Sequence, residues 1–143
     1  MLPRTRPRGN RVTLAPLLQS SPVIVVHALA ALSAFVLGAV QLLAPKGTLP
    51  HRLLGWVWVV LMAVVAAGAL GIHTIRLVGP FSPIHLLSLF TLAILPLAVL
   101  HARRHRVRQH GRMMVLLFTG ALVIAGGFTL LPGRIMHAVV FGG

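Results

Sequence analysis

Four long stretches of this chain contain no Lys, Arg, Asp or Glu, and this feature restricts its fold more than any other. The stretches are residues 12–45, 53–75, 77–102 and 113–133. Each exceeds the ~18–20 residues that a helix needs to cross the hydrocarbon layer of a bilayer. Their apolar residues are continuous rather than alternating, which favours helices over membrane strands.

The sequence therefore predicts an all-α integral membrane protein with spans at residues 22–44, 51–75, 83–101 and 110–131. The connectors are short, so consecutive helices should be antiparallel neighbours in an up-down four-helix transmembrane bundle. We expect three segments, which are a basic, mobile N-terminal arm (1–21), the transmembrane domain (22–134) and a short apolar tail (135–143).

The charges are one-sided, with 13 Lys and Arg, no Asp or Glu, 8 His and no Cys. This composition excludes catalytic carboxylate pairs, Asp-containing triads, carboxylate sites for Mg or Ca, disulfides and iron–sulfur clusters. The arginines lie between the spans, so anionic lipid headgroups rather than nucleic acids are their expected partners. Histidine is the main side chain left that binds metals or titrates near neutral pH.

The two membrane faces carry similar numbers of Lys and Arg, so the positive-inside rule alone does not determine the orientation of the protein. The Arg-rich 102–109 connector lies closest to the membrane, and we expect it to be cytoplasmic. Trp56 and Trp58 lie near the start of the second span, where tryptophans typically anchor a helix at the interface.

Four histidines lie at or near the starts of the four spans, namely His27, His51, His85 and His110. Antiparallel threading places His27 and His85 near one membrane face, and His51 and His110 near the other. The separations also repeat, because His27 and His51 are 24 positions apart and His85 and His110 are 25 apart. The chain thus has the pattern of two quasi-repeated helical hairpins.

In an up-down ring, each of these pairs comes from diagonally opposite helices. Two imidazoles that approach one iron from opposite faces are the ligands of a bis-His haem. We therefore predict one or two haem b groups, held by His27 with His85 and by His51 with His110. Four arginines are candidate partners of the haem propionates, with lipid phosphate as the alternative partner: Arg52, Arg76, Arg112 and Arg134.

The first functional hypothesis is a transmembrane b-type cytochrome-like electron carrier that works with a quinol or a redox partner protein, rather than a stand-alone enzyme. The alternative is an accessory structural subunit of a larger membrane complex, without a cofactor, in which the histidines are interfacial polar residues. A small carrier or a histidine-based metal site is a third hypothesis. Homo-oligomerisation is compatible with all three.

Residues 24–137 resemble a family of small bacterial membrane proteins called domain of unknown function 2306. The matching stretches are HALAALSAFVLGAVQL, HRLLGWVWVVLM, GPFSPIHLLSLFTL and QHGRMMVLLFTGAL. The resemblance implies a protein with several spans in the bacterial cytoplasmic membrane, and its motif histidines map to His27, His51, His85 and His110. Their placement is also similar to that in two-haem transmembrane b-type cytochromes.

Overall fold

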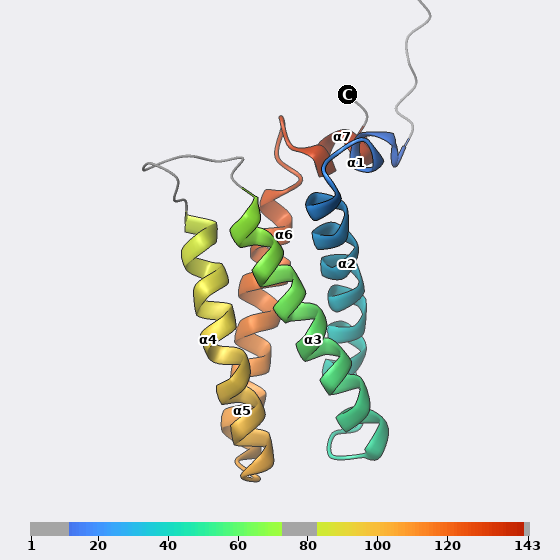
Figure 1. The fold of residues 1–143 in the computed structure, drawn as a ribbon. Coiled ribbons are helices and arrows are strands. Elements are labelled where there is room, and N and C mark those ends of the chain that lie inside the picture. The colour runs from blue at the N-terminus through green and yellow to red at the C-terminus, as the bar shows by residue number, and fades with distance from the viewer. Residues whose placement is uncertain (1–11, 73–82, 142–143) are drawn as a thin grey trace, which may run out of the picture.

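The computed structural model describes residues 12–72 and 83–141, and four long antiparallel helices dominate them (Figure 1). Each is long and apolar enough to cross a membrane, which confirms the predicted all-helical membrane bundle. The spans are α2 (Pro22–Leu43), α3 (Leu49–Gly71), α4 (Pro83–Arg103), and a fourth formed by α5 (Val107–Leu117), the π-helical segment η1 (Phe118–Ile124) and α6 (Ala125–Phe128).

The four spans form a ring in chain order. Helix α3 packs against α2 and α4, while the fourth span packs against α4 through α5 and against α2 through η1. Helices α2 and α4 therefore occupy one diagonal, and α3 and the fourth span occupy the other (Figure 1). This is the arrangement on which the predicted histidine pairing depends.

The second span begins at Leu49, two residues before the predicted start, because Thr48 caps it. The Thr48 hydroxyl accepts a hydrogen bond from the backbone N–H of His51 at 3.3 Å. Pro50 occupies the first turn, where its missing N–H costs no helical hydrogen bond. His51 consequently lies inside the first turn of α3, in a fixed orientation relative to the helix axis.

A tight turn joins α4 to α5 and is shorter than the predicted connector. The N–H of Arg106 donates to the carbonyl of His101 at 2.9 Å, and the N–H of His105 donates to that of Ala102 at 3.1 Å. These two bonds form a Schellman motif, in which His105 takes the left-handed conformation with φ 55°. The fourth span therefore begins at Val107 rather than residue 110, and it ends at Phe128 rather than residue 131.

Two short helices pack together beside the N-terminal end of α2 (Figure 1). They are α1 (Ala15–Leu18), within the segment that we assigned to a mobile arm, and α7 (Ile135–Phe141), within the predicted apolar tail. The N–H of Thr13 donates to the carbonyl of Val139 at 3.1 Å, and the side chains of Leu17 and Val139 are buried. Residues 12–21 are thus tied to the chain's other end, while residues 1–11 lie outside the described residues.

The bundle core receives side chains from all four spans, and Trp58 is the largest of them. Trp58 is only 2% exposed, and its indole N–H donates to the carbonyl of Ala34 in α2 at 2.9 Å. The prediction that it anchors the helix at the interface is therefore wrong, whereas Trp56 is exposed. Trp58 faces inward because α2 presents a glycine, Gly38, directly opposite the indole.

Gly38 leaves room for two aromatic side chains, and we predict that Gly38→Ala destabilises the bundle. A Cβ at this position would lie 2.6 Å from Trp58 Nε1 and 2.7 Å from Phe118 Cδ2, well inside van der Waals contact. We expect a loss of about 1–3 kcal/mol, the usual cost of overpacking a core. Thermal unfolding in detergent, followed by helical circular dichroism, measures the change.

The matched control is Gly126→Ala, because nothing lies within 4 Å of a Cβ added at Gly126. This variant should melt at or slightly above the temperature of the unmodified protein, since alanine favours helix more than glycine does. Equal melting temperatures for Gly38→Ala and the unmodified protein would contradict the tight packing at Gly38.

Candidate functional site

A cavity of about 750 Å³ opens at the end of the bundle that carries the α2–α3 and α4–α5 connectors. All four spans contribute to its lining, and its volume lies within the range of ~300–1,000 Å³ that is usual for small-molecule and cofactor sites. Most of the lining is apolar, and it includes aromatic, aliphatic and thioether side chains, namely Trp56, Trp58, Val59, Met114, Val115 and Phe118.

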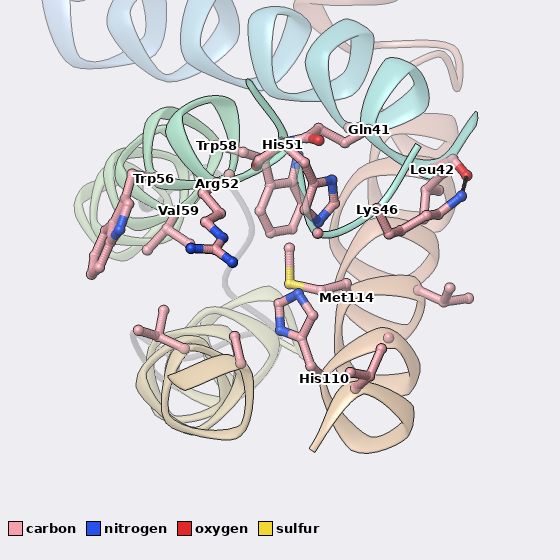
Figure 2. Close-up of a pocket in the computed structure, with 18 of the residues that line it drawn as sticks. Gln41, Leu42, Lys46, His51, Arg52, Trp56, Trp58, Val59, His110 and Met114 are labelled. Carbon is pink, nitrogen blue, oxygen red and sulfur yellow. Dashed lines mark hydrogen bonds between the residues drawn. The ribbon is translucent and has the colours of Figure 1, made fainter. Parts of the chain in front are cut away.

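His51 and His110, one of the two predicted pairs, both line this cavity. His51 projects from the first turn of α3, and His110 projects from the first turn of α5 on the opposite corner of the ring. Figure 2 shows the two rings pointing toward one another across the cavity, with the thioether of Met114 beside them. The structure therefore brings these two histidines to one site.

The ring of His110 is held by a neighbouring helix. Its Nδ1 lies 2.9 Å from the carbonyl oxygen of Ala98 in α4. A carbonyl oxygen only accepts, so Nδ1 carries a proton, and Nε2 is the nitrogen with a free lone pair when the ring is neutral. The backbone of α4 thus fixes the orientation of the His110 ring.

Three cationic side chains also line the cavity, and all three are exposed: Lys46, Arg52 and Arg103. The ammonium of Lys46 donates to the carbonyl of Leu42 at 2.7 Å. Because the chain contains no Asp or Glu, no side-chain carboxylate is present to neutralise these cations. The cavity thus joins an apolar interior to a positively charged mouth, which suits a ligand with an apolar body and acidic groups at one edge.

The inner end of the cavity is closed by aromatic packing. Gly38, Trp58 and Phe118 line the cavity and also contact one another closely. Phe118 further stacks on Phe35 of α2, with ring centroids 5.4 Å apart. Phe118 is the first residue of the π-helical segment η1, a type of segment often found at functional sites.

Gln41 adds a buried amide to the cavity wall. Its Nε2 donates to the backbone carbonyl of His51 at 3.0 Å. Its Oε1 and the Nδ1 of His51 are both buried, and neither has a hydrogen-bond partner among residues 12–72 and 83–141. Gln41 was not among the predicted site residues, although a lone amide within an uncharged span marks a candidate site in the sequence itself.

The second predicted pair lies toward the other end of the bundle, near the starts of α2 and α4. The Nδ1 of His27 is 2.9 Å from the carbonyl oxygen of Val65 in α3, so this ring is also oriented by a neighbouring backbone. Gly68 permits this contact, because a Cβ there would lie 3.2 Å from the Cβ of His27. His85 is buried within the bundle, with 5% of its surface exposed.

The four predicted arginines are distributed differently from the histidines. Arg52 lines the cavity, whereas Arg112 lies with Arg108 along a shallow depression on the outer face of the fourth span. Arg134 is half-buried at the opposite end, just before α7, and Arg76 lies outside the described residues. Lys46 and Arg103, which we did not single out, take part in the cavity instead.

Two other histidines, His105 and His137, lie at the edge of the cavity or outside its lining. His137 bonds the carbonyl of Leu130 through Nδ1 at 2.8 Å, and His105 forms the α4–α5 turn at the edge of the cavity. Within the described part of the chain, no three His, Cys, Asp or Glu side chains gather to hold a metal ion.

Comparison with known proteins agrees with the membrane architecture. No curated protein and no solved structure matches the chain. One family model matches residues 24–140, which include all but the first two residues of the four spans and the whole lining of the cavity described above. The chain belongs to the family of predicted membrane proteins DUF2306.

Proposed function

We propose that this protein is a b-type cytochrome-like electron carrier, with a haem held between His51 and His110. The observation that carries the proposal is the convergence of these two rings on one apolar cavity from diagonally opposite helices. The carbonyl of Ala98 orients the ring of His110 through Nδ1, which leaves Nε2 as the nitrogen that would bind the iron. Haem supplies four of the six iron ligands itself, so two histidines are enough.

The charges at the cavity mouth support haem over a neutral ligand. The propionates of haem are anions, and Arg52 and Arg103 offer bidentate donors to such groups. Lys46 adds a third positive charge. Because no carboxylate in the chain competes for these cations, an acidic ligand would be their only strong partner apart from lipid.

The ligand set also favours electron transfer over oxygen chemistry. When histidines occupy both axial positions, the iron has no open position for oxygen, and the group serves to accept and donate electrons. The quinol or redox protein that exchanges these electrons would meet the protein at the cavity end of the bundle. We place the protein in the bacterial cytoplasmic membrane, with the basic α4–α5 turn facing the anionic inner leaflet.

A second haem at His27 and His85 extends the same proposal to the other membrane face. The support for this second site is that Val65 orients the ring of His27 in the way that Ala98 orients His110. Two sites at opposite ends of one bundle would let electrons cross the membrane.

The visible spectrum of the purified protein tests the first site. Protein from haem-replete cells should show sharp reduced α and β bands, and His51→Ala and His110→Ala should each remove the same haem. His137→Ala is the matched control and should keep full haem, because His137 does not line the cavity. Exogenous imidazole should restore haem binding to the two alanine variants, which separates a lost ligand from a lost fold.

Colourless, correctly folded protein would overturn the proposal. That outcome would favour the alternative of an accessory subunit of a larger membrane complex, in which the four histidines are interfacial.

The second site has its own pair of variants. His27→Ala and His85→Ala should leave the haem of His51 and His110 in place, and each should remove the same additional haem. Redox titration of the four single variants distinguishes the centres by their midpoint potentials. If His27→Ala and His51→Ala lose the same centre, the diagonal pairing is wrong.

The cavity arginines should contribute to haem affinity. We expect Arg52→Gln and Arg103→Gln each to raise the haem dissociation constant by about tenfold, which corresponds to about 1.4 kcal/mol. Arg112→Gln makes the same charge change outside the cavity and should leave the constant unchanged. Haem transfer to apomyoglobin, followed by absorbance, measures the constants, and equal effects of all three variants would show that only overall charge matters.

A further inference from the structure

Gln41 is the buried polar side chain of the cavity that the proposed function leaves without a role. It lies in α2, in a span with no charged residue, and only 9% of its surface is exposed. Burying an amide in an apolar environment is costly unless its polar atoms are hydrogen-bonded. Only half of that requirement is met here, because Nε2 is bonded to the carbonyl of His51 and Oε1 is not bonded within the described residues.

His51 likewise has a buried polar atom that lacks a hydrogen-bond partner within the described residues. Its Nδ1 is buried and also lacks a partner among the described residues, although the equivalent atoms of His27 and His110 each bond a carbonyl of a neighbouring helix. A histidine that binds a metal through Nε2 almost always donates its other N–H to an acceptor. His51 therefore needs an acceptor that no backbone carbonyl of the described chain supplies.

The acceptor and the donor belong to residues that are already in contact. The bond from Gln41 Nε2 to the His51 carbonyl places the amide beside the first turn of α3, and Figure 2 shows Gln41 extending over His51. Gly55, one turn further along α3, lies beside the same amide, since a Cβ there would be in ordinary van der Waals contact with Gln41 Nε2 at 3.6 Å.

We infer that Gln41 is the positioning residue of His51. Oε1 of Gln41 and Nδ1 of His51 are not bonded to each other in this structure. In the proposed role, Oε1 accepts the Nδ1 proton of the ring while Nε2 remains bonded to the carbonyl of the same residue. The two bonds hold the side chain and the backbone of His51 together, fix the proton on Nδ1 and leave the Nε2 lone pair directed at the cavity. This role rests on the proposed haem site, but the hydrogen bond itself can be measured without haem.

The first measurement uses the haem-free protein. With ¹⁵N-labelled histidine in detergent micelles, the ring nitrogen shifts of His51 should report the tautomer protonated on Nδ1. In Gln41→Met, which keeps the length of the side chain but removes the acceptor, the shifts should move toward the tautomer protonated on Nε2. Gln109→Met is the matched control, because Gln109 is exposed on α5 outside the cavity lining.

The second measurement uses the haem-loaded protein. Gln41→Met should weaken haem binding by about 10- to 100-fold, the usual effect of removing the partner of a histidine ligand. Gln41→Glu keeps an acceptor and makes it negative, so it should retain haem and lower the midpoint potential by stabilising the ferric form. Both Gln109→Met and Gln109→Glu should match the unmodified protein.

These results separate two kinds of failure. If the unmodified protein binds haem but the Gln41 variants keep its tautomer, affinity and potential, the role of Gln41 is overturned and the haem site stands. If the unmodified protein binds no haem, the proposed function fails, and the tautomer of His51 alone decides whether Gln41 holds this ring.

Discussion

The packing of Trp58 against α2 is the contact on which the rest of the bundle depends. Its indole donates to the Ala34 carbonyl and lies over Gly38, so α2 and α3 approach closely at mid-span. Phe118 of η1 meets the same glycine and brings the fourth span into this contact. These aromatic rings fill the bundle centre and close the cavity from inside. The cavity opens at the end of the bundle where His51 and His110 lie.

The absence of acidic residues shapes the chemistry of that end. In a chain with carboxylates, Lys46, Arg52 and Arg103 would be expected to form ion pairs with the protein itself. Here the chain has no side-chain anion, so lipid phosphate or an acidic ligand is the kind of partner left to these three cations. Neutral imidazole requires no counter-ion to bind a metal, which makes histidine ligands compatible with so basic a chain.

Much of this architecture could be predicted from the sequence, because apolar length and short connectors determine a helical membrane bundle. The same threading placed His51 and His110 on a common diagonal and at a common depth. The inward direction of Trp58 could not be predicted, because it depends on which face of α2 carries Gly38. The roles of Gln41 and Arg103 depend on contacts between helices, and periodicity within a single helix contains no information about such contacts.

The hydrogen bonds of the histidines reveal a relation between the two ends that the hairpin repeat does not describe. The repeat relates His27 to His85 and His51 to His110, and the structure gives equivalent bonds to His27 and His110, each from the start of its helix to a carbonyl in the second half of an adjacent span. One bond joins α2 to α3 and the other joins the fourth span to α4, so the two bonds hold adjacent helices together at opposite ends of the bundle. Each predicted pair therefore contains at least one histidine whose ring is oriented by the backbone of an adjacent helix. This orientation comes from helix packing, so it needs no acidic side chain, and the chain has none.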